Sequence, residues 1–357
     1  AGASSVDEGS TIVFTVTTAE YSAGDSFSYA LTGVESADIV GGAVSGTATI
    51  GVDGSATIAV ALVADSLTDA NTITISALGS SASAVVNDTS TTPEVTTAAL
   101  TIGADNVNFA GNASASSVDG SVSNSWNSYD TIVGGDGTDT LTAAVTNVTV
   151  RPNMTGVENL VLDDDGGATL NMVDVTGLTS ITSQGSGNAA DIQNLQSVGS
   201  ASFQNTTAGL SLGYTAAATS GGSDDLAINV QGVTLAGNIV LTAATNTIEA
   251  VSIASTVSAN TIADLQSTGA GTTTLNISGD QDLTITTNLD TEITSVSAAN
   301  FSGALSITGT NATGTTITSG SGDDTITSLG GDDTITSGSG DDTIDTGNGD
   351  NVVSAGA

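Results

Sequence analysis

Aspartates recur at a fixed spacing near the end of the chain. Three copies of Gly-Asp-Asp-Thr-Ile occur there, and in each copy an aspartate stands two residues before an aliphatic residue. The aliphatic positions, which include Ile317, Ile326 and Ile335, fall nine residues apart and continue to Val353. Carboxylates and carbonyls are the oxygen ligands that Ca²⁺ takes. The pattern fits the nonapeptide Gly-Gly-x-Gly-x-Asp-x-aliphatic-x, and it predicts a calcium-binding coil over residues 309–357.

Stacking makes these aspartates dependent on a cation. Successive nonapeptides lie on opposite sides of such a coil, so we expect Asp324 and Asp342 to stack on one side and Asp333 to face the other. Adjacent turns lie about 4.8 Å apart, where two carboxylates repel by about 1 kcal/mol in water and about 3 to 4 kcal/mol at an effective dielectric of about 20. Calcium between the turns reverses the sign, so its binding free energy becomes folding free energy.

The nonapeptide copies define the predicted calcium ligands. In the last region these are Asp323, Asp324, Asp332, Asp333, Asp341, Asp342, Asp350 and Asn351, with the turn glycines Gly322, Gly331 and Gly340. A separate copy over residues 130–142 adds Asp130, Asp136 and Asp139. Two degenerate copies add Asp225 and Asp282, either as ligands or as solvated turn residues.

Two further acidic groups have two interpretations. The run Asp163–Asp165 is either a loop site or a solvated corner. Glu8, Asp65, Asp69 and Asp88 either clamp a calcium ion at the end of the first domain or are surface charge.

Composition excludes most reaction classes. Lys+Arg totals 1, Asp+Glu totals 38, and the net charge is −37, with no histidine and no cysteine. A Ser-His-Asp or Cys-His nucleophile, a Schiff-base lysine and a His-ligated zinc are therefore excluded. So acidic a surface repels nucleic acid and anionic bilayers, and no apolar run reaches the roughly 18 residues of a membrane span. We therefore expect the protein to bind hard cations such as Ca²⁺.

The first part of the chain is predicted to be a small β-sandwich over residues 1–88. Short alternating runs occur at residues 11–17, 27–31, 48–50, 56–60, 72–75 and 84–86. Asp53-Gly54 between the third and fourth runs predicts a hairpin, and the spacing of the set is that of a sandwich. The polar segment that follows, which contains Pro93, predicts a linker over residues 89–97.

Residues 98–308 are predicted to form an irregular right-handed parallel β-solenoid. Short Thr-rich runs separated by polar corners show alternation and no helical period. Seven runs are taken as successive rungs: Glu158–Leu162, Leu178–Ile181, Asp225–Ile228, Glu249–Ile253, Thr274–Ile277, Asp282–Ile285 and Leu305–Ile307. Stability should come from stacking between neighbours. An array of sandwiches is the competing fold, and the whole chain is expected to be all-β.

The nonapeptides resemble those of the RTX family, secreted bacterial proteins whose calcium-binding repeats form β-rolls. Their combination with Thr/Ala/Gly-rich rungs and with Thr155–Leu160 is similar to RTX-type surface-layer (S-layer) proteins, and Ser5–Ser10 with Ala64–Asp69 resembles Ig-like or Calx-β-like modules. The resemblance implies type I secretion, calcium-driven folding outside the cell, and self-assembly into a coat. Leu329 and the serines at the first glycine positions depart from the pattern. The chain opens without a leader and closes in mid-pattern, so we expect an excerpt of a longer protein.

Three functions compete. The first is a non-enzymatic tile of an extracellular, cell-surface lattice, with copies of itself and cell-surface polysaccharide or lipopolysaccharide as partners. The second is an adhesin or biofilm-matrix protein that uses the solenoid as a stalk. A remote third is a carboxylate-based enzyme acting on polysaccharide. For that enzyme Arg151 could neutralise charge, but a structural ion pair is the expected role, and Trp126 and Tyr129 are expected to cover the solenoid core rather than bind a glycan.

Overall fold

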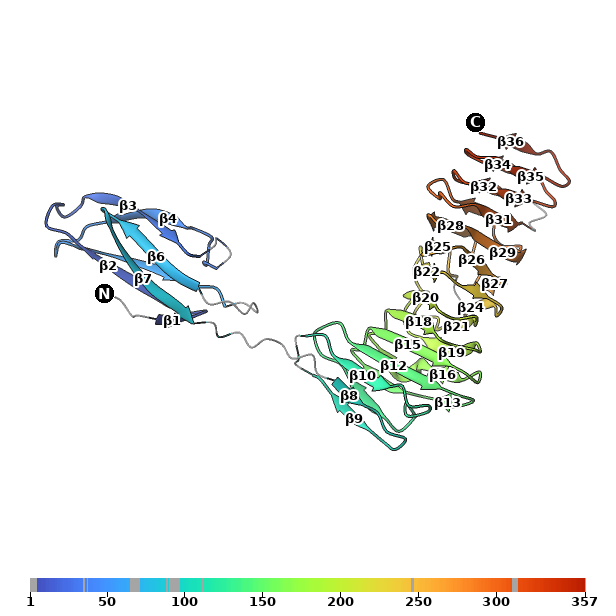
Figure 1. The fold of residues 1–357 in the computed structure, drawn as a ribbon, viewed down its shortest axis with the longest axis horizontal. Coiled ribbons are helices and arrows are strands. Elements are labelled where there is room, and N and C mark those ends of the chain that lie inside the picture. Colours follow the sequence, from blue (N-terminus) through green and yellow to red (C-terminus); the bar gives the residue numbers. More distant parts are fainter. Residues whose placement is uncertain are drawn as a thin grey trace. The chain divides into compact units, whose positions relative to one another are not determined.

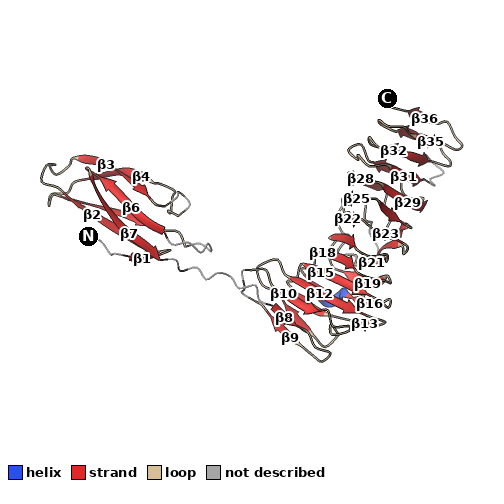
Figure 2. Cartoon of the chain, in the orientation of Figure 1, coloured by secondary structure: helices blue, strands red, loops and turns tan. Residues whose placement is uncertain are grey.

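The computed structural model describes residues 5–34, 36, 38–64, 71–87, 89, 97–110, 112, 114–244, 247–309 and 314–356. The chain divides into two compact units, residues 1–94 and 95–357. Strands and loops make up nearly all of the described residues (Figure 2), and the one short helical turn is the 3₁₀ segment Met172–Asp174. No helix among these residues is long and apolar enough to cross a membrane.

The first unit contains two β-sheets. A five-stranded sheet has the order β1-β7-β6-β3-β4, and β2 pairs with β5 in a separate antiparallel ribbon. The strands are β1 (Ser5–Asp7), β2 (Thr11–Thr17), β3 (Ser26–Thr32), β4 (Ser45–Thr49), β5 (Ser55–Ala61), β6 (Asn71–Ala77) and β7 (Ser80–Asn87). Alternation along β2 buries Ile12 and Phe14 in a core shared with Ile58 and Ile73, while the residues between them face out.

The predicted hairpin at Asp53-Gly54 is wrong. A tight turn forms there, with the Ser55 N–H donating to Asp53 Oδ1 at 3.1 Å and Gly54 at a φ of 74°. Its two flanking strands enter different sheets, however, because β4 pairs with β3 and β5 pairs with β2 over seven residues. The turn therefore carries the chain from one sheet to the other.

The second unit is a parallel β-solenoid, drawn from cyan-green to red in Figure 1. One continuous sheet of 13 strands runs along it. Its members are β8 (Thr97–Ala99), β10 (Ser117–Gly120), β12 (Thr140–Val145), β15 (Asn159–Asp164), β18 (Ser180–Gln184), β20 (Ser200–Gln204), β22 (Asp225–Gln231), β25 (Ala250–Thr256), β28 (Thr274–Gly279), β30 (Ser295–Ser297), β32 (Thr316–Thr318), β34 (Thr334–Thr336) and β36 (Val352–Ser354). We call it the long sheet.

The other faces of the solenoid are formed by three shorter sheets. A four-stranded sheet contains β9 (Asn106–Asn108), β11 (Thr131–Val133), β14 (Asn153–Thr155) and β17 (Val175–Thr176). A six-stranded sheet contains β13 (Thr149–Val150), β16 (Thr169–Asn171), β19 (Ala190–Leu195), β21 (Leu210–Tyr214), β24 (Ile239–Ala243) and β27 (Leu265–Gly269). A second six-stranded sheet contains β23 (Thr234–Leu235), β26 (Asn260–Ile262), β29 (Leu283–Asn288), β31 (Leu305–Thr308), β33 (Thr325–Thr327) and β35 (Thr343–Asp345).

The core is a ladder of aliphatic residues inside the solenoid. In the long sheet Leu141 pairs with Leu160 and Leu160 with Ile181, and all three are buried. The ladder continues to Ile317 and Ile335, which are fully buried. Most strands contribute one to three buried apolar side chains, although those of β36 are exposed, so stacking on neighbouring turns is what removes the core from water.

The seven predicted rungs are not all successive. Asp282–Ile285 and Leu305–Ile307 lie in a shorter sheet as β29 and β31, and β20 of the long sheet lies between Leu178–Ile181 and Asp225–Ile228. Thr274–Ile277 and Asp282–Ile285 were expected to be successive rungs, but β28 lies in the long sheet and β29 in a shorter one. They are two faces of a single turn. The register advances 27 residues from Ser200 to Ala227 and 18 residues from Thr316 to Thr334, so the turns shorten toward the nonapeptide region.

Candidate calcium sites between turns

The nonapeptides alternate between two sheets as their spacing predicts. β32 and β34 belong to the long sheet, whereas β33 and β35 pair with each other in a shorter sheet. We call the residue directly before a strand its corner residue. Asp324 and Asp342 are the corner residues of β33 and β35, and Asp333 is that of β34. Asp324 and Asp342 thus lie one turn apart on one side of the coil, and Asp333 lies on the other.

Two corner aspartates are buried, and one carboxylate oxygen of each has no hydrogen-bond partner among the described residues. Asp324 and Asp333 are each 1% exposed. Oδ1 of Asp324 accepts the Leu305 N–H at 2.8 Å, and Oδ1 of Asp333 accepts the Thr315 N–H at 2.7 Å. Within the described residues, Oδ2 of both is buried and has no hydrogen-bond partner. An ionised carboxylate buried in this way is costly unless a cation or donors compensate it, so these residues fit a calcium ion.

The next turn repeats the arrangement. Oδ1 of Asp342 accepts the Asp324 N–H at 3.0 Å, and Oδ1 of Asn351 accepts the Asp333 N–H at 2.9 Å. Each corner side chain therefore reaches back 18 residues to the backbone of the preceding turn. The Asp342 carboxylate thus lies against the backbone of Asp324, and the Asn351 amide lies against the backbone of Asp333.

Burial shifts the titration of Asp324. Loss of hydration raises the pKa of its carboxyl, and the nearby Asp342 carboxylate raises it further. The Ser319 hydroxyl and the Leu305 N–H lower the pKa, but the effect of burial is larger. The direction of the shift means that the negative charge of Asp324 is poorly compensated by the protein alone.

The neighbouring aspartates form a second ladder outside the coil. Asp323, Asp332, Asp341 and Asp350 are exposed. Oδ1 of Asp323 accepts the Asp341 N–H and Oδ1 of Asp332 accepts the Asp350 N–H, both at 2.8 Å. We call these four residues the outer ladder. They connect consecutive turns at the surface and leave carboxylate oxygens open to solvent.

The turn glycines allow the coils to approach closely. A Cβ on Gly322 would lie 2.3 Å from the carbonyl oxygen of Gly303, and one on Gly340 would lie 2.3 Å from that of Gly322. Gly340 also has a φ of 130°, which L-residues with a side chain rarely adopt. Gly331 has a φ of 97°. Backbone carbonyls of one turn thus contact the next turn at the level of the corner aspartates.

The separate copy at residues 130–142 places its aspartates differently. Asp130 is the corner residue of β11 and Asp139 that of β12, so they lie at two corners of one turn. Asp139 is 1% exposed and accepts the Ser116 and Gly135 N–H groups, both at 2.6 Å. Asp130 accepts the Asp105 N–H at 2.9 Å and the Asn127 N–H at 2.7 Å, and burial raises its pKa. Asp136 is exposed.

Acidic corner residues that the sequence analysis missed stack on these positions. The Asp139 N–H donates to Glu158 Oε2 at 2.8 Å, in the same manner as Asp324 donates to Asp342. Asp105 stacks below Asp130. Both precede an aliphatic residue by two positions, as in Asp105-Asn106-Val107 and Glu158-Asn159-Leu160. That spacing, rather than the glycines, was the available signal.

The two degenerate copies place their predicted aspartates, Asp225 and Asp282, at exposed positions. Asp225 is exposed on β22 and accepts the Ser252 hydroxyl at 2.8 Å, so it does not lie at the corner. The corner residue is Asp224, whose N–H donates to Glu249 Oε2 at 2.7 Å and whose Oδ2 has no partner among the described residues. Asp282 directly precedes β29 but is exposed, and it accepts the Ala304 N–H of the next turn at 2.8 Å, as Asp323 of the outer ladder accepts the Asp341 N–H.

The acidic run Asp163–Asp165 lies in a loop that is held by hydrogen bonds to Asp164. Asp164 is fully buried and accepts three N–H groups, from Gly166 and Gly167 at 2.9 Å and from Ala168 at 2.8 Å, so it holds its own loop. Burial, with Asp165 and Asp164 nearby, raises the pKa of Asp163.

The acidic group at the end of the first domain lies mostly outside the described residues. Glu8 is described, whereas Asp65, Asp69 and Asp88 lie outside the described residues.

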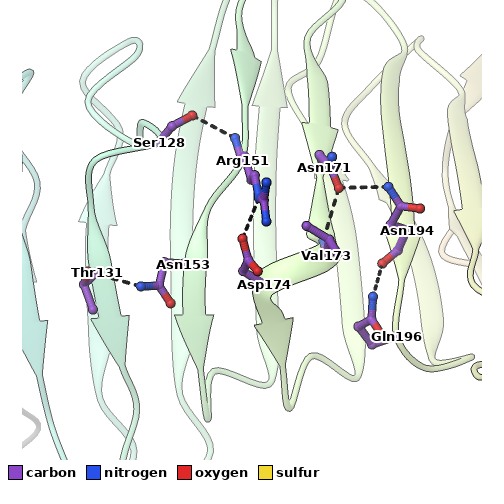
Figure 3. Close-up of polar contacts among 9 residues, drawn as sticks. All are labelled: Ser128, Thr131, Arg151, Asn153, Asn171, Val173, Asp174, Asn194 and Gln196. Carbon is purple, nitrogen blue, oxygen red and sulfur yellow. Dashed lines mark hydrogen bonds and ion pairs between the residues drawn. The ribbon is translucent and has the colours of Figure 1, made fainter.

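Arg151 forms the expected ion pair (Figure 3). Its Nε lies 2.6 Å from Asp174 Oδ2 on the surface of the solenoid, and the contact lowers the pKa of the Asp174 carboxyl. Beside it, Asn194 Nδ2 donates to Asn171 Oδ1 at 2.9 Å across adjacent turns. Trp126 is buried in the core as expected, but Tyr129 is 81% exposed, so the prediction that it covers the core is wrong.

No group of three or more acidic side chains within metal-binding range occurs in the part of the chain that the structure describes. The corner pairs supply two side chains at most. A calcium ion there would take its further oxygen ligands from turn carbonyls and water.

The family model that describes the RTX calcium-binding nonapeptide repeat matches the chain in four copies, at residues 128–146 and 316–357. The chain therefore carries RTX repeats, and these support calcium as its ion. The matched segments include Asp130, Asp139 and all the corner aspartates from Asp324 onward. No curated protein and no solved structure matches the chain.

Proposed function

We propose that this chain is a structural component of an extracellular calcium-dependent surface layer. The observation that carries the proposal is the pair of buried, half-satisfied carboxylates at Asp324 and Asp333, inside the matched RTX repeats. Calcium bound between the turns would neutralise the stacked carboxylates and rigidify the solenoid. Because the net charge is −37, calcium ions would also bridge the acidic surfaces of neighbouring subunits.

The proposal assigns a role to each part. The first unit, with its two sheets, would be an Ig-like or Calx-β-like sandwich joined by a linker over residues 89–97. The solenoid, taken as right-handed, would be the tile, and residues 309–357 would be its calcium-dependent roll. Type I secretion, self-association and attachment to cell-surface polysaccharide or lipopolysaccharide belong to the same proposal, which involves no catalysis.

A calcium titration tests this function. EDTA-treated protein is titrated with CaCl₂ while far-UV circular dichroism follows β-structure and sedimentation velocity follows size. β-structure and large assemblies should appear together, reverse with EDTA, and not appear with equimolar MgCl₂. Folding without assembly would favour the second candidate, an adhesin or matrix protein whose solenoid acts as a stalk. No response to calcium in either measurement would contradict both.

A further inference from the structure

A groove lies where one sheet of the solenoid ends. β27 is the last strand of the six-stranded sheet that begins with β13, and the next turn places β29 in the other six-stranded sheet. In the described part of the chain β27 pairs only with β24, so its other edge has no strand beside it. Residues of β24, β27 and β29, together with Asp264 and Asp290, line a groove of about 650 Å³ here, which we call the ledge groove. Small-molecule sites have volumes of about 300–1,000 Å³.

Polar side chains in the ledge groove are already held in place by the protein. Asp264 Oδ2 accepts a hydrogen bond from Gln266 Nε2 at 2.7 Å, and Asp264 Oδ1 accepts one from the Thr287 hydroxyl. The Asp290 carboxylate accepts the Ser267 N–H and, at 3.2 Å, the Ser267 hydroxyl. A ligand therefore meets an ordered polar surface, which lowers the entropic cost of binding.

Two amide groups in this surface keep hydrogen-bonding capacity for a ligand. Within the described residues, Gln266 uses only its NH₂ group, toward Asp264, and its carbonyl oxygen accepts no hydrogen bond. The Asn288 side chain is exposed and forms no hydrogen bond with any of those residues. Val240 and Thr242 add methyl groups to the same lining. A sugar ring has hydroxyls at its rim and C–H groups on its faces, and this lining can satisfy both.

Charge selects the kind of sugar. Asp264 and Asp290 contribute two carboxylates to the groove, and the single cation of the chain, Arg151, is paired with Asp174 outside it. A uronic acid or a phosphorylated sugar would be repelled by these carboxylates and by the net charge of −37. A neutral sugar is not repelled, and its hydroxyls can donate to the same carboxylates.

We propose that the ledge groove binds a neutral oligosaccharide segment. Gln266 and Asn288 form hydrogen bonds to the sugar, and Asp264 positions Gln266. The inference rests on the proposed function, which includes attachment to a cell-surface polysaccharide, and it names the site and the charge class of that polysaccharide. A cation held by the two carboxylates is the competing occupant.

Saturation-transfer difference NMR on the whole chain in calcium tests the site. The probes are the neutral trisaccharides maltotriose, cellotriose, mannotriose and triacetylchitotriose, with trigalacturonate as the anionic counterpart. At least one neutral probe should give a signal that saturates with concentration, and trigalacturonate should give none.

Three variants locate the binding. Gln266→Ala and Asn288→Ala should each weaken binding of that neutral probe by roughly fivefold, as expected for one lost hydrogen bond. Gln193→Ala is the matched control, because Gln193 Nε2 donates to Asp191 Oδ2 at 2.6 Å in the same Asp-x-Gln arrangement on β19 of the same sheet. Gln193 does not line the ledge groove, so this variant should bind as the wild type does.

The outcomes separate the groove from the proposed function. The absence of a saturable signal from every neutral probe overturns the inference, and so does equal binding by the three variants, which would place the sugar elsewhere. Binding of trigalacturonate in calcium without binding of a neutral probe would indicate a cation in the groove and also overturns it. Calcium-driven assembly without sugar binding leaves the proposed function standing, whereas sugar binding without assembly leaves the groove standing and removes the surface layer.

Discussion

A carboxylate with one oxygen accepting a backbone N–H and the other buried without a hydrogen-bond partner carries a poorly compensated charge. Asp324 and Asp333 have this environment, whereas Asp164 and Asp139 have protein donors to both oxygens. These aspartates thus differ in how many of their carboxylate oxygens accept a hydrogen bond from the protein. We therefore expect calcium to bind at Asp324 and Asp333, whose second carboxylate oxygens have no protein donor among the described residues.

Asp324→Asn should act in opposite directions with and without calcium. In calcium it should lower the free energy of unfolding by roughly 3 kcal/mol, because a buried charge pair loses one partner. In EDTA it should leave that free energy unchanged or raise it, because a poorly compensated charge is removed. Urea unfolding under both conditions measures this. Asp280→Asn, at an exposed aspartate of the solenoid that is not a predicted ligand, is the control, with an expected change of about 0.5 kcal/mol or less. A loss of stability in EDTA as large as in calcium would contradict the prediction.

The raised pKa of Asp324 predicts a pH dependence of the calcium-free protein. The pKa of the folded state lies above the ordinary value of 3.8. Protonation therefore favours the folded state, and this stabilisation is complete below the unfolded pKa and is lost as the pH rises through the folded pKa. In EDTA the melting temperature should fall over that window. Asp324→Asn should show a smaller fall, and identical profiles for the two proteins would exclude Asp324 as the cause. The lowered pKa values of Asp174 and Glu249 act in the opposite direction but equally in both proteins.

At the scale of the element, a single strand contributes little by itself. β34 is three residues long and buries one aliphatic side chain, Ile335. Its neighbours β32 and β36 provide the surface against which that side chain packs. Interior and terminal positions of the same ladder should therefore respond differently to the same truncation.

Ile335→Ala should cost about 2 to 4 kcal/mol in calcium, because the side chain is fully buried and leaves a cavity. Val353→Ala, in the same ladder, should cost about 1 kcal/mol or less, since Val353 is 45% exposed. Denaturant unfolding of both variants at fixed calcium gives the comparison. Equal costs would mean that the ladder does not pack as described.

The elements also show which features could be predicted from sequence. The aliphatic ladder and the alternation of nonapeptides follow from spacing alone, because a fixed period places equivalent residues on one face. The assignment of Thr274–Ile277 and Asp282–Ile285 failed because strands on both faces of a turn have the same alternation, and turn length varies. The choice of Asp225 over Asp224 failed for a similar reason: the pattern was aligned on the glycines, whereas the aliphatic residue fixes the corner. The hairpin at Asp53-Gly54 failed because turn chemistry does not determine the partner of each strand.

At the scale of the whole molecule, charge opposes compaction. A chain with a net charge of −37 repels itself over about 30 Å at 0.01 M salt and about 3 Å at 1 M salt. In EDTA we expect the radius of gyration, measured by small-angle X-ray scattering, to decrease as NaCl rises between these limits. Calcium at millimolar concentration should compact the chain further than NaCl at equal ionic strength. Equal effects of the two salts would indicate screening alone and would count against specific sites.

The side-chain hydrogen bonds between turns run in both directions, and this has a mechanical consequence. The corner side chains Asp324, Asp333, Asp342 and Asn351 accept an N–H of the turn before them, whereas Asp323 and Asp332 of the outer ladder accept an N–H of the turn after them. Because each of these bonds joins two neighbouring turns only, the roll under tension applied to its ends should yield one turn at a time. Each 18-residue turn would release about 60 Å of chain. Calcium clamped in each gap would raise the force of every step without changing its length.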